Sequence, residues 1–137
     1  MKNTFTLIVL SLALLASPNV VYGQGNTFVV TSKEDSGSGT FRQALTDAQS
    51  GDSITFDASV FLSDSPDTIF LTSPLPELLN GNLVVDASNA GVVIDGSRIT
   101  IQDRNGLTIF SSNNVIRGLH LMNFSKAGIG LEGGAQN

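Results

Sequence analysis

The chain has no cysteine, a single histidine and no nucleophile motif, and each absence excludes a class of function. Without cysteine there is no disulfide, no thiol nucleophile and no cysteine-ligated zinc or iron–sulfur centre. His120 is the only possible base for a Ser-His-Asp triad, and no serine stands in a G-x-S-x-G pattern. Stability must therefore come from packing and hydrogen bonding.

Basic residues are also scarce. The chain has 7 Lys and Arg against 12 Asp and Glu, which gives a net charge of −5 at pH 7. This balance argues against nucleic acid as a partner and against binding to anionic lipid by charge. The acidic residues are scattered rather than clustered, which is typical of a solvated surface, with calcium binding as a secondary interpretation.

Long hydrophobic runs are missing except at the start, where residues 1–23 predict a secretory signal peptide. Lys2 precedes an apolar run over residues 7–16, and the small residue Gly23 stands before the predicted cleavage point. The alternative is a membrane anchor, but the run is far shorter than the roughly 20 residues that a spanning helix needs. We therefore predict secretion or cell-surface localisation, with no membrane span after the signal is removed.

The remaining residues, 24–137, are enough for one domain and too few for two. Residues 24–80 are predicted to form an N-terminal strand, a helical cap and the opening strands, and residues 81–137 the repeated coils. Apolar residues alternate with polar ones in short runs bounded by turn-forming residues. Strands are predicted in TFVVTS, DSITFD, DTIFLTS, NLVVDAS, GVVIDGS, ITIQD, GLTIFSS, NVIRGLHLMNF and GIGLEGG.

One helix is predicted among these strands, over residues 40–50. Thr40 and Gln43 fit a capping box, in which two side chains satisfy orphan backbone N–H groups. Gly51 is placed to end the helix in a left-handed turn. A narrow apolar stripe at helical spacing consists of Phe41, Ala44, Leu45 and Ala48. So short a helix is not stable alone, so we expect it to cover the open first coil.

The same residue types recur at a shift of 22 positions, which predicts a solenoid. Leu107 aligns with Ile129, and Ile94-Asp95-Gly96 aligns with Ile116-Arg117-Gly118. In a parallel β-solenoid, equivalent residues stack about 4.8 Å apart, and Asn or Ser at the corners can form hydrogen-bonded ladders. A β-sandwich with regularly spaced strands is the alternative, although it gives no reason for residue types to repeat.

VTSKEDSGSGTFRQALTDAQSGDSITF, followed by TIFLTSPLPEL, LVVDAS and VIDGS, resembles the opening segment of secreted right-handed parallel β-helix repeat proteins. It matches their pattern D-S-G-x-G-[ST]-[LF]-R-x-A-[IL], followed by G-D-x-I-x-F. NNVIRGLHLMNFSKAGIGLEGG is similar to the repeats themselves, which share the pectate-lyase-like superfold. The resemblance covers nearly all of residues 28–137 and implies an all-β, right-handed parallel β-helix with a short N-terminal capping helix.

For function, the resemblance implies two classes. The first is a structural or binding module, adhesin-like or carbohydrate-binding, whose outer faces recognise a polysaccharide or a cell-surface ligand. The second is a polysaccharide lyase or glycoside hydrolase whose site forms on later coils, with calcium-binding carboxylates and a basic residue on one outer sheet. We favour the first for this chain, because it has no D-D or D-x-D motif of the kind a hydrolase of this fold would need.

Three charged residues are candidates for a ligand or metal site. Asp95 and Arg117 are expected at equivalent places in successive coils, where they would form a small anionic-sugar site or, more simply, an ion pair. Asp86 and Asp95 are the best candidates to bind calcium, although Asp86 is first a turn residue. His120 should point outward between two inward leucines and is not expected to act as a base.

Two features near the end of the sequence complete these expectations. Residues 123–125 match an N-glycosylation acceptor. The final residues, EGGAQN, stop within a repeat and carry no closing element. We therefore expect the chain to continue into further β-helix coils, on which catalytic or binding residues could lie.

Overall fold

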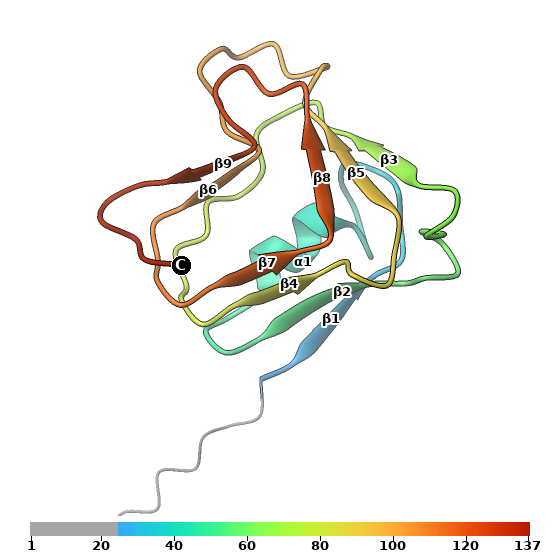
Figure 1. The fold of residues 1–137 in the computed structure, drawn as a ribbon, viewed down its shortest axis with the longest axis horizontal. Coiled ribbons are helices and arrows are strands. Elements are labelled where there is room, and N and C mark those ends of the chain that lie inside the picture. Colours follow the sequence, from blue (N-terminus) through green and yellow to red (C-terminus); the bar gives the residue numbers. More distant parts are fainter. Residues whose placement is uncertain (1–24) are drawn as a thin grey trace, which may run out of the picture.

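A computed structural model describes residues 25–137, and the signal peptide predicted for residues 1–23 lies outside the described residues. The protein is an all-β parallel β-helix with one short helix, as the sequence predicted (Figure 1). Its elements are β1 (Thr27–Val30), α1 (Phe41–Asp47), β2 (Ser53–Phe56), β3 (Asp67–Phe70), β4 (Val84–Asp86), β5 (Val92–Asp95), β6 (Leu107–Ile109), β7 (Val115–Arg117), β8 (Leu119–Met122) and β9 (Ile129–Leu131). Over residues 25–137, no helix is long and apolar enough to cross a membrane.

The strands form three parallel sheets that wrap around one interior. The first sheet has the order β1-β2-β4-β7, the second β3-β5-β8 and the third β6-β9, and every strand pair is parallel. Successive coils of the chain therefore add one strand to each sheet in turn. The β-sandwich alternative is wrong, because such a sandwich is built from antiparallel strands.

Alternate strand residues point inward and stack into apolar columns. Ile54 of β2 pairs with Val85 of β4, and both side chains are fully buried. In the second sheet Ile69 pairs with Ile94, which are buried as well. Because strand side chains alternate between two faces, the residues between them face solvent. Burying one such aliphatic side chain stabilises the fold by about 1.5–3 kcal/mol.

The predicted register is half right. Leu107 pairs with Ile129 at a shift of 22, as expected. The alignment of Ile94 with Ile116 is wrong, because Ile94 pairs with Leu121 and Ile116 pairs with Val85. Connecting loops differ in length, so the shift between paired strands changes from one sheet to the next. Two strands that are 22 residues apart can therefore belong to different sheets.

Polar side chains at one corner join successive coils, which confirms the expected ladders. The Asp52 carboxylate accepts a hydrogen bond from the backbone N–H of Asn26 at 2.7 Å. Asn114 Oδ1 accepts one from Leu83 N at 3.1 Å, and Asn137 Oδ1 accepts one from Asn114 N at 2.6 Å. Each side chain thus satisfies a backbone donor of the preceding coil at the point where the ladder of the first sheet begins.

The helix α1 covers the first coils from the end where the described chain begins. Thr40 is its N-cap, and the hydroxyl accepts a hydrogen bond from Gln43 N at 3.2 Å. The reciprocal half of the capping box does not form, since Gln43 Nε2 donates to Asp47 Oδ1 instead. The Phe41 ring lies 5.3 Å from that of Phe56 on β2, so the apolar stripe closes the interior as expected.

The helix is shorter than predicted and ends at Asp47 rather than at residue 50. Asp52 explains the difference, because its carboxylate accepts a 2.7 Å hydrogen bond from Gln49 N and holds that segment in a turn. Ala48 is consequently extended, with φ −64° and ψ 137°. Gly51 does have the left-handed conformation expected of it, with φ 90°, but it serves the turn into β2 and does not cap the helix.

A partly buried ion pair fastens the helix to the second coil. Arg42 Nη2 lies 2.5 Å from Asp35 Oδ1, and the guanidinium also donates to the carbonyl oxygens of Ser73 and Pro74. The other Asp35 oxygen accepts hydrogen bonds from the backbone and hydroxyl of Thr72. Burial raises the pKa of Asp35, but the bonds from Thr72 and Arg42 outweigh it and hold that pKa below its usual value. The D-S-G-x-G-T-F-R motif therefore has a structural role here.

Candidate binding pocket

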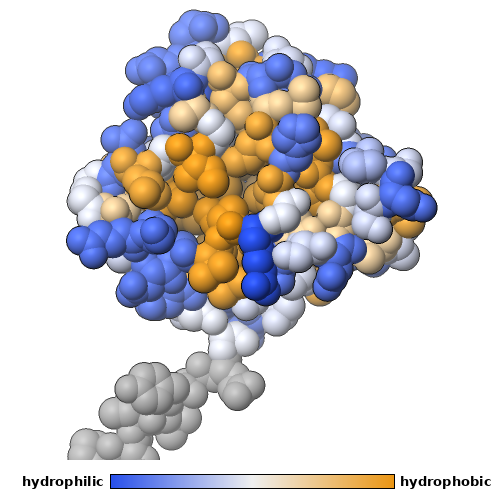
Figure 2. Space-filling model, viewed as in Figure 1, coloured by the Kyte–Doolittle hydropathy of each residue, from blue (hydrophilic) through white to orange (hydrophobic). Residues whose placement is uncertain are grey.

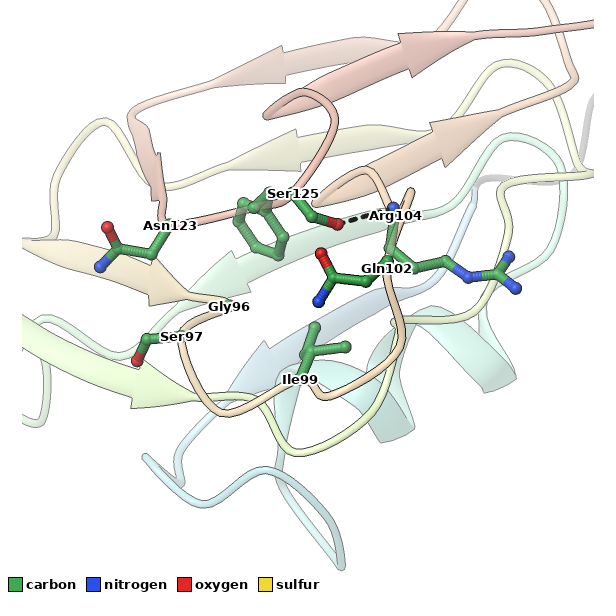
Figure 3. A pocket seen from close by; sticks show the side chains of 8 residues that line it. Gly96, Ser97, Ile99, Gln102, Arg104, Asn123 and Ser125 are labelled. Atoms are coloured by element: carbon green, nitrogen blue, oxygen red, sulfur yellow. Dashed lines mark hydrogen bonds between the residues drawn. The ribbon is translucent and has the colours of Figure 1, made fainter.

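A pocket of about 420 Å³ opens at the corner between the second and third sheets. Two connections form its walls. The pocket loop, residues 96–106, joins β5 to β6, and the pocket turn, residues 123–128, joins β8 to β9 in the next coil (Figures 1 and 3). The lining residues are Gly96, Ser97, Ile99, Gln102, Arg104, Asn123, Phe124 and Ser125.

The pocket loop is an insertion relative to the repeat. Paired residues are 27 positions apart between β5 and β8, but only 22 apart between β6 and β9. The pocket loop is therefore 5 residues longer than the pocket turn that follows the same path one coil later. In solenoid proteins, insertions of this kind tend to gather on the face that binds.

Hydrogen bonds between neighbouring coils fix the two walls to each other. Arg104 N donates to the Ser125 hydroxyl at 3.0 Å (Figure 3). Lys126 N donates to Arg104 O at 3.1 Å, and Gly106 N donates to Ala127 O at 2.8 Å. Because these bonds involve backbone groups at the base of the loop, the pocket is preformed and does not need a ligand to assemble it.

Phe124 is packed against glycines of the neighbouring coil. A Cβ atom on Gly96 would lie only 2.6 Å from Phe124 Cδ1, and one on Gly106 would lie 2.8 Å from Phe124 Cε2. Both positions therefore require glycine if the ring is to stay where it is. The ring is half-buried, so part of it remains available at the pocket wall.

The polar lining combines amides, two hydroxyls and a guanidinium. Gln102 and Arg104 come from the pocket loop, and their side chains make no hydrogen bond or ion pair with any other described residue. Asn123, which has φ 60°, lies across the pocket on the pocket turn. These groups offer both donors and acceptors to a ligand.

Asp95 supports the pocket from the end of β5. Its carboxylate accepts hydrogen bonds from Ser97 N at 2.7 Å and from Asn123 Nδ2 at 3.0 Å, which links the two walls. The residue is only 7 % exposed, and burial by itself would raise its pKa. The bonds from Ser97 and Asn123 outweigh that effect, so the pKa of Asp95 lies below its usual value. Asp95 is therefore an ionised support that orients the Asn123 amide.

The expected placement of Asp95 beside Arg117 is wrong. Arg117 lies on β7 in the first sheet, where it pairs with Asp86 of β4, whereas Asp95 lies in the second sheet. Arg117 Nη2 is 2.7 Å from Asp86 Oδ2. Hydrogen bonds from Arg117 and Ser88 hold the pKa of Asp86 well below its usual range. The incorrect alignment of Ile94 with Ile116 caused the error, and the ion pair of Arg117 is made with Asp86.

The two aspartates proposed as calcium ligands do not share a site. Asp86 and Asp95 belong to different sheets, and hydrogen bonds already engage both carboxylates. In the part of the chain that the structure describes, no three His, Asp or Glu residues come together in a way that could hold a metal ion. His120 is exposed on the outer face of β8, which confirms its predicted orientation.

Gln102 was missed because ITIQD, residues 99–103, was predicted to be a strand, and Arg104, which follows it, was interpreted as a turn or strand-end residue. The structure has no strand there: Ile101 is half exposed and Asp103 has φ 60°. A sequence signal did exist, because the Asp-Arg-Asn-Gly run at residues 103–106 is typical of a turn. The unequal spacing of the repeats, which would have revealed the insertion, required the strand pairs to be known.

Comparisons of the chain with protein-family models, with curated proteins and with solved structures found no match.

Proposed function

We propose that the protein is a secreted or cell-surface β-helix module that binds carbohydrate in the pocket between residues 96–106 and 123–128. The observation that carries this proposal is the 5-residue insertion in the pocket loop, which supplies Gln102 and Arg104 to a preformed hollow. The connection between β4 and β5, residues 87–91, is also longer than its counterpart between β7 and β8, but it does not line the pocket. The pocket loop is therefore the longer connection that builds a hollow.

The chemistry of the lining suits a sugar. Planar amide and guanidinium groups present fixed pairs of donors or donor and acceptor, which match the vicinal hydroxyls of a pyranose. The C–H face of a sugar ring packs well on an apolar wall, which Phe124 and Ile99 provide here. The side chains of Gln102 and Arg104 have no partner among the described residues, so binding would break no existing hydrogen bond of theirs.

The alternative function is a polysaccharide lyase or glycoside hydrolase. Such chemistry needs a base and an acid, or a metal ion with carboxylate ligands, close to the sugar. The pocket-lining residues include no carboxylate, and Asp95 behind them is occupied by Ser97 and Asn123. The pocket can thus hold a ligand by hydrogen bonding and packing. Its residues support binding rather than catalysis.

A glycan array followed by calorimetry tests the proposal. We expect the protein to bind a subset of oligosaccharides, with a Kd raised about tenfold or more by Arg104→Ala or Gln102→Ala. Arg117→Ala and Gln136→Ala are matched controls, because these residues are of the same types and lie outside both the pocket loop and the pocket turn. Absence of binding to any glycan, or equal losses in the control variants, would show that the pocket is not a carbohydrate site.

A second assay distinguishes the enzyme alternative. The protein is incubated with polygalacturonate and calcium, and the absorbance of unsaturated product is followed. We expect no turnover. Steady product formation would replace the binding proposal with the lyase alternative.

A further inference from the structure

The sequence contains two Asn-Gly pairs, Asn80-Gly81 and Asn105-Gly106. This pair is chemically labile, because the backbone nitrogen after the asparagine can attack the side-chain amide. Glycine has no side chain to obstruct that approach, and its backbone adopts conformations that other residues rarely reach. The structure gives the two pairs opposite surroundings, so they can be compared directly.

The first pair lies at a turn in the connection between β3 and β4. Asn80 is exposed and Gly81 is half-buried. Figure 2 shows that most of the hydrophilic surface lies around the rim of the molecule, where connections between strands run in Figure 1. The N–H of Gly81 donates no hydrogen bond to any residue in the described range 25–137. Water therefore reaches the Asn80 amide, and the attacking nitrogen is not engaged elsewhere in that range.

The second pair is buried at the end of the pocket loop. Asn105 is only 7 % exposed, and its Nδ2 donates to Thr108 Oγ1 at 3.3 Å. Gly106 N donates to the carbonyl oxygen of Ala127 in the next coil at 2.8 Å. Attack on the Asn105 amide would require this bond to break and the segment to open first. The same two residue types are therefore protected here.

The stacking of the coils explains why glycine follows Asn80. A Cβ atom on Gly81 would lie 2.6 Å from the carbonyl oxygen of Ser112 in the next coil. Asn82 N donates to that same oxygen at 3.1 Å, which keeps the two coils close at this point. The fold therefore requires glycine directly after an exposed asparagine.

We propose that Asn80 is a site of spontaneous deamidation, and that the product weakens the attachment of this turn to the end of α1. The Gly81 nitrogen loses its proton and attacks Asn80 Cγ. A C–N bond forms, the Cγ–Nδ2 bond breaks, and Nδ2 leaves as ammonia. The result is a cyclic imide. Water then adds to one of its two carbonyl carbons and opens the ring, which gives aspartate or isoaspartate at this position.

The hydrogen bonds of Asn80 explain why the product should weaken the attachment. Asn80 Nδ2 donates to the carbonyl oxygen of Ala48, the C-cap of α1, at 3.1 Å. Both products replace this donor by a carboxylate, which only accepts hydrogen bonds and would face another acceptor. Isoaspartate also lengthens the main chain by one methylene group. It does so where Asn80 O accepts a hydrogen bond from Ser111 Oγ at 3.1 Å, so the stacking of two coils would shift as well.

Peptide mapping by mass spectrometry tests the modification. The folded protein is incubated at mildly alkaline pH, where more of the attacking nitrogen loses its proton, and is then digested. The peptide with Asn80 should gain about 1 Da at least about fivefold faster than the peptide with Asn105, because the second site must open before it reacts. Protein unfolded in urea should react at both positions at similar rates. An isoaspartyl methyltransferase should label the Asn80 peptide of the folded protein, and Asn80→Gln should abolish that labelling.

Two outcomes would overturn the assignment of Asn80. One is an equal rate at both pairs in the folded protein. The other is a folded protein that stays unchanged at Asn80 while the unfolded protein reacts there.

Asn80→Asp reproduces one of the products and tests the structural consequence. It should lower the urea midpoint by about 0.5 M, because the hydrogen bond to Ala48 is lost. Asn89→Asp is a matched control that makes the same change in charge, since Asn89 is exposed and lies in the connection between β4 and β5. The control should keep the midpoint of the parent. An unchanged midpoint for Asn80→Asp, or equal shifts in both variants, would show that the product does not weaken the attachment of α1.

Discussion

The two ends of this solenoid carry the same kind of inward-facing residues and differ in what lies over them. At one end Val30 and Phe41 are fully buried because α1 packs across the coil. At the other end, formed by β7, β8 and β9 and here called the open end, Ile129 and Leu131 continue the apolar columns of the third sheet but are about half exposed among the described residues. The pattern within a strand therefore predicts which way a side chain points. Whether that side chain is buried depends on whether another coil or a helix covers it.

The covered end also shows what a helix needs in order to cover the interior. An apolar stripe is not enough, because a helix of 7 residues is not stable alone. Arg42 and Asp35 connect the helix to the second coil through the carbonyls of Ser73 and Pro74 and through Thr72. After β9, the hydrogen bonds of Asn137 run to Asn114 and Ser111 of the preceding coil, and among the described residues no helix lies over the apolar positions of β9. The contrast between the ends can be tested by perturbing each of them.

The largest expected difference in stability is between the same substitution at two paired positions of adjacent coils. Leu107→Asp places a charge at a fully buried position and should abolish the cooperative unfolding transition. Ile129→Asp places it at the open end, where solvent reaches the carboxylate, and should lower the free energy of unfolding by only about 1 kcal/mol. Urea unfolding followed by circular dichroism at low protein concentration measures both. Equal losses would mean that the open end is covered in solution.

Removing the largest buried side chain of α1 should have the next largest effect on stability. Phe41→Ala deletes a fully buried ring that contacts Phe56, and we expect a loss of about 3–5 kcal/mol in the free energy of unfolding. Phe110→Ala is a matched control, because that ring is 43 % exposed. Thermal melts should show a large shift for the first variant and a small one for the second. Comparable shifts would contradict the role of α1 as the cover of the interior.

We expect acid to weaken the attachment of α1 to the second coil, because it protonates Asp35. Because the pKa of this carboxyl is lowered in the folded protein, its contribution to stability is present above the ordinary value of 3.8 and is lost as the pH falls below it. Asp35→Asn should therefore reduce stability at pH 7, by about 1–2 kcal/mol for a partly exposed group. It should also flatten the decline of the urea midpoint below about pH 4. Asp64→Asn, at an exposed position, should leave the decline unchanged.

The smallest effect is expected for the ion pair beside the open end. Arg117→Ala removes the partner of Asp86, but Arg117 is exposed and Asp86 is only partly buried, and ion pairs so close to solvent contribute little. We expect no measurable change in the urea midpoint near neutral pH. A large loss would mean that Arg117 takes part in a contact beyond the pair with Asp86.

The sequence was most informative where one residue type has one local consequence. Thr40 as the helix N-cap, the apolar stripe from Phe41 to Leu45 and the outward orientation of His120 were all predicted correctly. Each depends on a few neighbouring residues. The end of the helix was predicted incorrectly, because Asp52, which lies beyond it, holds Gln49 out of the helix.

The candidate site was the least predictable part. A constant shift of 22 placed Asp95 beside Arg117, although they belong to different sheets. Gln102 was assigned to a strand, and neither it nor Arg104 was singled out as a candidate site residue. Both errors have one cause, since the loops between strands vary in length and the sequence does not show which strands will pair.

The sequence by itself determined that this chain alternates short apolar strands with turns and has one capped helix after its first strand. Alternation, capping and turn formation are local properties of the backbone and its nearest side chains. Only the tertiary structure decided which strands pair, and therefore that Arg117 meets Asp86 and that the inserted loop faces Asn123 across a pocket. Pairing is a contact between segments more than 20 residues apart, and its register follows from loop lengths and the packing of the whole interior.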